Sequence, residues 1–384
     1  MSAAILAAIF PILAAGAHLS GIAIAIVRCR ERRAPLPRPA HEPAVSIIIP
    51  VCGLENYSAE TARSAFLLDY SRYELIFCAA RADDPVVPLI RRMIADHPWI
   101  DARLLIGDER ISSNPKLNNV FKGWQQAAHA FVAITDGNVL LRRDYIQSMF
   151  AALDPETGVA SSPPIGCLPQ GFWAEVECAF LNGYQARWQY FADTIGLGFA
   201  QGKTLFWRRG DLERAGGIRA LGCEIAEDAA STKIVREAGL RVRLMQPPVH
   251  QPLGARNAAE VWRRQQRWAR LRRGTFPLFF VPEALAGALV PVIAAGIAAD
   301  IAGYSALAAA AAFAAIWYGG EMLMALACGW PVSRYFLACA MLRDLMLPLL
   351  WLDAWRANTF EWRGTPMDMA ENMAENMAES VQQS

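Results

Sequence analysis

The stretch VSIIIPVCGLE, residues 45–55, is the part of the sequence that decides the fold. It opens with Val45–Ile49, a short run of mostly β-branched apolar residues, which is typical of a strand buried on both faces. Similar runs follow at Leu75–Ala79, Ala102–Ile106 and Phe131–Thr135. Each run ends shortly before polar residues, so the pattern predicts four buried strands with functional groups after their carboxyl ends.

Amphipathic stretches separate these runs, and they predict helices at Ala59–Leu68, Val86–Asp96 and Pro115–Ala128. Alternating strands and helices indicate an α/β fold with a parallel sheet covered on both faces. Ligands bind at the carboxyl ends of the strands in such sheets. Further elements are predicted along the chain, namely a helix near residues 171–191, a strand at Thr204–Arg208, a helix at Ala226–Ala238, a strand at Leu240–Met245 and a helix at Ala258–Arg273.

The two ends of the chain are much more apolar than this middle part. Hydrophobic residues make up 54% of the sequence and charged residues 19%, while the net charge of +1 gives no global field for nucleic acid. Ala3–Val27 is long enough to cross a bilayer. Four arginines follow it, Arg28, Arg30, Arg32 and Arg33, and the positive-inside rule places them in the cytoplasm.

The C-terminal part contains three more apolar segments. Ala284–Gly303 and Ala306–Cys328 are long enough to span a bilayer. Tyr335–Leu352 is shorter and carries Arg343 and Asp344 in its middle, where charges are costly unless they are paired. We therefore expect three spans and an interfacial or re-entrant helix, with four full spans as the alternative.

These observations divide the chain into five expected segments. They are an N-terminal transmembrane helix (1–28), a basic, Pro-rich linker (29–44), a cytoplasmic catalytic domain that includes the arginine-rich helix (45–275), a C-terminal membrane region (276–356) and a flexible tail (357–384). The protein is thus expected to be an integral membrane protein with a cytoplasmic catalytic domain. Its short, alanine-rich membrane region favours a bacterial chain, whose site would be the inner membrane.

Three carboxylates stand out near predicted strand and helix ends. Asp84 follows the second strand, Asp136 ends the fourth in "TDG", and Asp228 opens a helix in "IAED". A single aspartate at such a position is usually a turn former or helix cap. Three at one edge of a sheet instead suit a divalent cation, Mg²⁺ or Mn²⁺, that bridges a diphosphate.

Two basic motifs add candidate anion sites. In "EVWRRQQRWARLRR", Arg264 and Arg267 are three residues apart and share a helix face, and guanidinium groups bind phosphate bidentately. The outer arginines of this helix could equally lie on anionic lipid headgroups. In "NPKLNN", Lys116, Asn118 and Asn119 begin a helix, a position that suits an anion.

Eight motifs in order give the chain its resemblance to the ceramide glucosyltransferases, glycosyltransferase family 21, the lipid branch of the inverting GT-A class related to family 2. They are "SIIIPVCGLE", "LDYSRYEL", "DDP", "DARLLIG", "NPKLNN", "TDG", "IAED" and an RxxRW box at residues 264–268. The resemblance runs from about Val45 to Pro282. It implies a Rossmann-like GT-A domain, here flanked by N- and C-terminal transmembrane helices.

The resemblance also implies roles for individual residues. Glu55 and Asp84 would bind the ribose and uracil of a UDP-sugar, and Asp136 would bind the metal. Asp228 would be the general base that deprotonates the acceptor hydroxyl. The RxxRW box, with Arg264, Arg267 and Trp268, would clamp the diphosphate and the acceptor.

The implied reaction is inverting transfer of a hexose, with glucose expected, from a UDP-sugar to a ceramide-like lipid at the cytoplasmic membrane face. Two alternatives stay open on the sequence. One is a transferase for another lipid, such as a hopanoid or diacylglycerol. The other is a catalytically silent, membrane-bound binder of nucleotide sugars.

Overall fold

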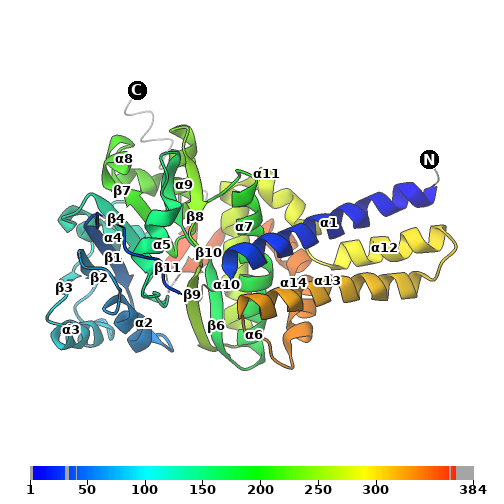
Figure 1. Cartoon of the computed structure of the whole chain (residues 1–384), viewed down its shortest axis with the longest axis horizontal. Coiled ribbons are helices and arrows are strands. Elements are labelled where there is room, and N and C mark those ends of the chain that lie inside the picture. The colour runs from blue at the N-terminus through cyan, green and yellow to red at the C-terminus, as the bar shows by residue number, and fades with distance from the viewer. Residues whose placement is uncertain (1–2, 31–33, 40, 363–364, 369–384) are drawn as a thin grey trace. The chain divides into compact units, whose positions relative to one another are not determined.

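The structure is a computed structural model that describes residues 3–30, 34–39, 41–362 and 365–368. Figure 1 follows the chain from its N-terminus in blue to its C-terminus in red. The chain forms two compact units. The sheet unit comprises Arg32–Ile165, Ala192–Gly254 and Asp368–Ser384, and the helical unit comprises Met1–Glu31, Gly166–Phe191 and Ala255–Met367.

These units divide the chain differently from the five expected segments. The expected catalytic segment 45–275 contributes residues 166–191 and 255–275 to the helical unit, so the arginine-rich helix groups with the apolar helices. Arg32 and Arg33 lie outside the described residues, and so do residues 363–364 and 369–384 of the expected flexible tail 357–384. The described part of that tail is not flexible coil, because Thr359–Trp362 and Thr365–Asp368 pair as a two-stranded sheet.

Within the described residues, the sheet unit holds a seven-stranded sheet with the order β3-β2-β1-β4-β7-β5-β8. Its strands are β1 (Val45–Val51), β2 (Tyr73–Ala79), β3 (Asp101–Ile106), β4 (Phe131–Thr135), β5 (Thr157–Ser161), β7 (Thr204–Arg208) and β8 (Arg241–Leu244). The strands β1 to β4 pair in parallel, as predicted. However, β7 runs antiparallel to both β4 and β5, so the sheet is mixed rather than wholly parallel.

Helices cover both faces of this sheet. One face carries α2 (Ser58–Ala65), α3 (Val87–Asp96) and α5 (Tyr145–Ala152), and the other carries α4 (Pro115–Gln126), α8 (Arg209–Arg214), the 3₁₀ helix η2 (Ile218–Cys223) and α9 (Glu227–Glu237). Successive residues of β1 point to opposite faces, because Ile47 packs with the first set and Ile48 with the second, both fully buried. The predicted two-sided covering of the sheet is therefore confirmed.

The helical unit is built from segments far apart in the sequence. Its elements are α1 (Ala3–Cys29), α6 (Phe172–Cys178), the π-helix η1 (Ala179–Ala186), the start of α7 (Arg187–Thr194), α10 (Ala258–Thr275), α11 (Pro277–Phe280), the 3₁₀ helix η3 (Val281–Leu285), α12 (Leu289–Ile301), α13 (Ala306–Cys328), α14 (Phe336–Ala354), β10 (Thr359–Trp362) and β11 (Thr365–Asp368, whose last residue belongs to the sheet unit). The chain passes between the units within α7 and near the ends of β6 (Pro164–Gln170) and β9 (Val249–Ala255).

Three apolar helices, α1, α12 and α13, pack against one another. The His18 ring of α1 stacks on Trp317 of α13 with 3.6 Å between ring centroids, and its Nε2 lies 3.1 Å from the Trp317 carbonyl oxygen. Among the described residues, α1 and α13 are each long and apolar enough to cross a membrane. A third span results if η3 and its neighbours are joined to α12 as one broken span.

The expected span Ala284–Gly303 is not one uninterrupted helix. The segment Pro277–Leu285 meets α12 at an angle of 49°, and α12 itself has only 13 residues. At 1.5 Å per residue such a helix covers about 20 Å, less than the ~30 Å hydrocarbon core. The break falls between Leu285, the last residue of η3, and Leu289, the first residue of α12.

The charged pair in the middle of α14 is buried and paired inside the helical unit. Arg343 and Asp344 are 1% and 2% exposed. The Arg343 guanidinium lies 3.0 Å from Glu321 of α13 and 2.8 Å from Asp344. Charges inside an apolar helix are tolerated when they are paired, and Glu321, 22 residues earlier in the chain, pairs with Arg343.

Candidate active site

The junction of β4 and β7 forms the centre of the candidate site. Thr135, the last residue of β4, pairs with Thr204, the first residue of β7. This register places Asp136 beside Lys203. The N–H of Asp136 donates to the Lys203 carbonyl at 3.2 Å, and the Lys203 ammonium lies 2.8 Å from Asp136 Oδ2. Main-chain and side-chain contacts therefore fix the Asp136 carboxylate at the end of the strand.

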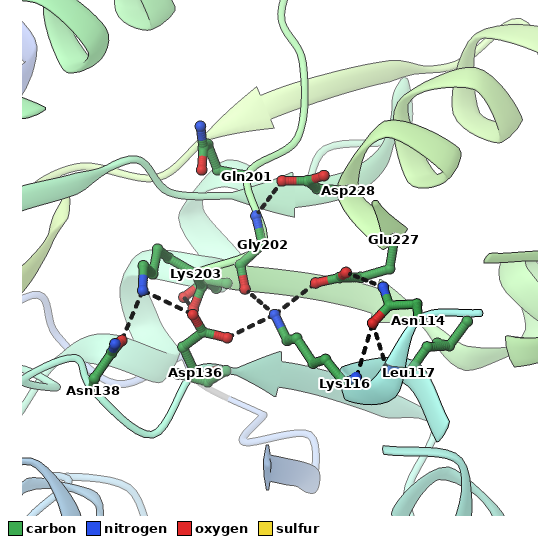
Figure 2. Close-up of polar contacts among 12 residues, drawn as sticks. Asn114, Lys116, Leu117, Asp136, Asn138, Gln201, Gly202, Lys203, Glu227 and Asp228 are labelled. Atoms are coloured by element: carbon green, nitrogen blue, oxygen red, sulfur yellow. Dashed lines mark hydrogen bonds and ion pairs between the residues drawn. The ribbon is translucent and has the colours of Figure 1, made fainter. Parts of the chain in front are cut away.

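The start of α4 is shaped by the pair Asn114-Pro115. Asn114 is the N-cap, and its Oδ1 accepts from the N–H groups of Lys116 at 2.8 Å and Leu117 at 3.2 Å. Pro115 follows at a position where a helix has no use for an N–H. The cap leaves the Lys116 side chain directed toward the carboxylates of the site (Figure 2).

The Lys116 ammonium lies among three oxygen atoms. Its Nζ is 2.6 Å from Asp136 Oδ1, 2.6 Å from Glu227 Oε1 and 2.6 Å from the Gly202 carbonyl oxygen. Figure 2 shows these three contacts converging on the ammonium from β4, α9 and the segment before β7. Lys116 therefore joins the three parts of the chain that carry the acidic groups.

The lysines control the charge of Asp136. Burial by itself would raise the pKa of this carboxyl, but Lys116 and Lys203 together hold the pKa of Asp136 well below its usual range. Conversely, burial alone would lower the pKa of Lys116, and Asp136 and Glu227 raise it above its ordinary value. Both groups are therefore charged at neutral pH.

The cluster carries an excess of negative charge. Asp136, Glu227 and Asp228 provide three carboxylates, and Lys116 and Lys203 provide two ammonium groups, which leaves one negative charge when all five are ionised. A diphosphate would add further negative charge at this place. Binding it requires additional positive charge, which a divalent cation could supply.

The residues present fit a cation that arrives together with a diphosphate. Among the described residues, no three His, Cys, Asp or Glu side chains are grouped so that they could hold a metal ion by themselves. Magnesium, however, is commonly bound by one or two carboxylates together with substrate phosphates. Asp136, with 22% of its side chain exposed, and the amide oxygen of Asn138 two residues later could supply such partial ligation.

Asp228 lies on the other side of Gly202 from Lys116. Its Oδ2 accepts from the Gly202 N–H at 2.8 Å (Figure 2), and its Oδ1 accepts from the Ala229 N–H at 2.8 Å. Burial, together with the Glu227 carboxylate, raises the pKa of Asp228 from 3.8 to about 6, although Lys116 acts in the opposite direction. A carboxylate with a pKa near neutrality is a better general base than an ordinary aspartate.

Glu55 and Asp84 lie near this cluster along the sheet edge. The Asn138 Nδ2 is 3.3 Å from each carboxylate oxygen of Glu55, and its Oδ1 accepts from the Lys203 ammonium at 2.7 Å. Asn138 thus connects Glu55 to the charged cluster. Asp84 accepts from the Gly53 N–H at 2.9 Å and 3.0 Å, so it ties the loop after β1 to the loop after β2.

Asn118 was expected at an anion site, and in the structure its side-chain amide forms hydrogen bonds with the backbone of the preceding loop. Its Oδ1 accepts from the N–H groups of Ile111 at 2.9 Å and Ser112 at 3.0 Å, and its Nδ2 donates to the Ser112 carbonyl at 3.0 Å. The side chain is 6% exposed. These contacts give Asn118 the role of fixing the loop before α4.

The RxxRW box lies on α10 in the helical unit. The Arg264 guanidinium is 2.7 Å from Glu177, a side chain only 1% exposed, and lies 4.8 Å from the centre of the Trp268 ring. Arg267 follows one turn later, half-buried on the same helix. Arg264 is thus already ion-paired. Arg264, Arg267 and Trp268 belong to the helical unit, whereas the remaining predicted site residues lie in the sheet unit.

Three residues of the cluster were not predicted, namely Asn114, Lys203 and Glu227. The Asn-Pro pair was a recognisable helix start, so capping preferences could have identified Asn114. Glu227 stands beside Asp228 in "IAED", and the motif does not distinguish which of the two carboxylates contacts Lys116. Lys203 gave no signal, because only the antiparallel pairing of β4 with β7 brings it to Asp136.

A solved structure shares this fold. The chain is similar to the mannosyltransferase PcManGT from Pyrobaculum calidifontis, solved in complex with GDP-Man and Mn²⁺, with a TM-score of 0.51 and 20% sequence identity over 91% of this chain and 97% of that chain. The class that the mixed sheet and its covering helices define is therefore the GT-A fold of nucleotide-sugar transferases.

The family follows from the sequence. The family model of Glycosyl transferase family 21 matches residues 13–374, so the chain belongs to this family. Ceramide glucosyltransferase 1 of Caenorhabditis elegans is 28% identical over 245 residues, which cover 63% of this chain and 53% of the nematode protein. Ceramide glucosyltransferase of Komagataella phaffii is 33% identical over 112 residues, or 28% of this chain and 22% of that protein. The chain thus spans about half the length of the nematode relative.

Proposed function

We propose that this protein is an inverting glycosyltransferase that moves a hexose, glucose in the first instance, from a UDP-sugar to the primary hydroxyl of ceramide. The observation that carries the proposal is the Asp228 carboxylate, whose pKa is raised to about 6, within a family 21 chain. It stands beside a cluster of charged groups, Asp136, Lys116 and Lys203, that suits a metal-bound diphosphate.

The reaction is a single displacement at the anomeric carbon. Asp228 accepts the proton of the lipid hydroxyl. The hydroxyl oxygen forms the new bond to the anomeric carbon as the bond from that carbon to UDP breaks. A base on one side and a stabilised leaving group on the other invert the anomeric centre, which gives a β-glycoside from an α-linked donor. A divalent cation held by Asp136 would neutralise charge on the departing diphosphate.

The remaining site residues are assigned by their likeness to the family pattern. In this proposal Glu55 and Asp84, which follow the neighbouring strands β1 and β2, bind the ribose and uracil. Arg264, Arg267 and Trp268 bind the diphosphate and the acceptor.

The apolar helices and their flanking arginines support a membrane location. The catalytic groups face the cytoplasm in this proposal, because Arg28 lies in the last turn of α1 and Arg30 follows the helix directly. In this proposal residues 45–275, the expected catalytic domain, lie outside the bilayer. A ceramide-like acceptor would reach the site from the membrane.

A transfer assay tests the proposal. Purified protein in nanodiscs is given separate UDP-sugars, Mg²⁺ or Mn²⁺, and ceramide, diacylglycerol or a hopanoid, and the lipid products are read by mass spectrometry. Glycosylceramide formation supports the proposal and fixes the sugar. Glycosylation of another lipid alone overturns the acceptor assignment, and UDP binding without any transfer favours a silent binder.

The role of Asp228 predicts how the rate depends on pH. The carboxyl must be ionised to accept a proton, and its pKa of about 6 places the loss of that form just below neutrality. We expect kcat/KM to be level above pH 7 and to fall about tenfold per pH unit below ~6. The measurement is the initial rate over this range, with UDP binding at each pH as the control for an intact donor site. A level profile down to pH 5 would contradict the assignment.

A further inference from the structure

The Lys116 ammonium occupies a position that resembles a metal site in its ligands. Three oxygen atoms, from Asp136, Glu227 and Gly202, each lie 2.6 Å from its Nζ. Carboxylate and carbonyl oxygens are also the ligands that hard divalent cations prefer. The protein therefore places one of its own positive charges where a cation would otherwise find ligands.

This position is enclosed. Only 11% of the Lys116 side chain and 6% of that of Glu227 are exposed. Gly202 closes one side with its backbone, because a Cβ at this residue would meet Glu227 Oε1 at 2.9 Å and Lys116 Nζ at 3.3 Å. A metal ion and the ammonium cannot share this space, since both need the same oxygen atoms.

The second lysine strengthens the effect at Asp136. Lys203 takes the other oxygen, Oδ2, at 2.8 Å and also contacts Asn138 Oδ1 at 2.7 Å (Figure 2). Both oxygens of Asp136 are thus neutralised before any substrate binds. A divalent cation that approached Asp136 alone would meet two positive charges within hydrogen-bond distance of the carboxylate, and their repulsion disfavours binding.

We propose that Lys116 is an exchangeable internal cation, which excludes a divalent metal ion from Asp136 and Glu227 until a nucleotide diphosphate binds. The inference rests on the proposed function, since it assumes that a UDP-sugar is the donor. The diphosphate supplies new oxygen ligands both for the metal ion and for the ammonium, so Lys116 can turn from the carboxylates to a phosphate. Metal and nucleotide then enter together.

The proposal predicts strong coupling between metal and nucleotide. Binding of Mn²⁺ to the purified full chain in detergent is measured by electron paramagnetic resonance, with and without UDP. In the unchanged protein, UDP is expected to tighten Mn²⁺ binding by about tenfold or more. In Lys116→Met, Mn²⁺ binds without UDP about tenfold more tightly than to the unchanged protein, and UDP adds little.

Two further variants serve as controls. Lys116→Arg retains the positive charge and should keep the dependence on UDP. Lys122→Met removes a lysine from the same helix whose ammonium contacts Gly107 and Asn119 instead of the acidic cluster, and it should bind Mn²⁺ as the unchanged protein does. Thermal unfolding of each variant reports folding, and Mn²⁺ alone should stabilise Lys116→Met but not the unchanged protein.

The outcomes separate the inference from the function. Equal Mn²⁺ affinity in Lys116→Met and the unchanged protein overturns the inference, and so does tight, UDP-independent Mn²⁺ binding to the unchanged protein. If Lys116→Met does not fold, Mn²⁺ binding to the unchanged protein with and without UDP decides. The same measurement on Lys116→Arg, which should keep the dependence on UDP, supports or contradicts the inference in addition. Failure to bind UDP under any condition instead overturns the proposed function.

Discussion

Asp228→Asn is expected to lower the turnover of lipid glycosylation by roughly 10²–10⁴-fold, while UDP binds as it does to the unchanged protein. The asparagine side chain has nearly the same shape, and its oxygen can still accept from the Gly202 N–H that now contacts Asp228 Oδ2 at 2.8 Å. It cannot take a proton from the acceptor hydroxyl. The measurement compares lipid product at saturating substrates with UDP affinity from calorimetry.

Asp83→Asn is the matched control for this variant. Asp83 also lies in the sheet unit, but its side chain is 68% exposed and pairs with Arg81 on the surface. We expect it to retain full turnover. If Asp228→Asn also keeps full turnover, Asp228 is not the base, and a neighbouring group such as Glu227 would have to be tested for that role.

The strands β1 to β4 could be predicted because each is encoded by a short run of mostly apolar residues. Val45–Ile49 and Phe131–Thr135 are continuous apolar runs, and the structure has strands there, β1 and β4. The helix Ala306–Cys328 has the predicted bounds, since its residues are nearly all apolar and Gly329 ends it in the left-handed conformation. The direction of β7 was not predictable, because pairing between distant strands sets it.

The candidate site divides in the same way. Asp136 and Asp228 follow recognisable motifs, and the structure brings both to the segment around Gly202 and Lys203. Their roles remain proposals. The spacing of residues could not show that Asn118 fixes a loop, since this depends on the contacts of its side chain with Ile111 and Ser112.

The same limit applies to the helix α14. Two adjacent charges within an apolar segment suggested an interfacial helix, because a sequence does not show which distant residue pairs with them. Glu321 supplies the partner for Arg343 from α13. With the pair compensated, charge alone no longer argues against placing α14 within the bilayer, so the number of spans has to be decided by labelling its two ends.

Arg343→Met is expected to destabilise the helical unit by roughly 3–5 kcal/mol, because it leaves two buried carboxylates without their shared counter-ion. The guanidinium lies 3.0 Å from Glu321 and 2.8 Å from Asp344. Asp344 would retain the Tyr318 hydroxyl at 3.1 Å and the Ala288 N–H at 3.0 Å, which compensate it only in part. The measurement is thermal unfolding in detergent, together with the yield of monodisperse protein.

A second substitution separates the loss of charge pairing from the loss of packing. Adding Glu321→Gln to Arg343→Met removes one of the two unpaired charges, so the double variant should be more stable than Arg343→Met alone. Arg334→Met is the control, since Arg334 is exposed and lies over the Tyr335 ring, and it should unfold as the unchanged protein does. If Arg343→Met were as stable as this control, the ion pairs would not hold α14 to α13. If the double variant were no more stable than Arg343→Met, the lost stability would come from packing of the long arginine side chain.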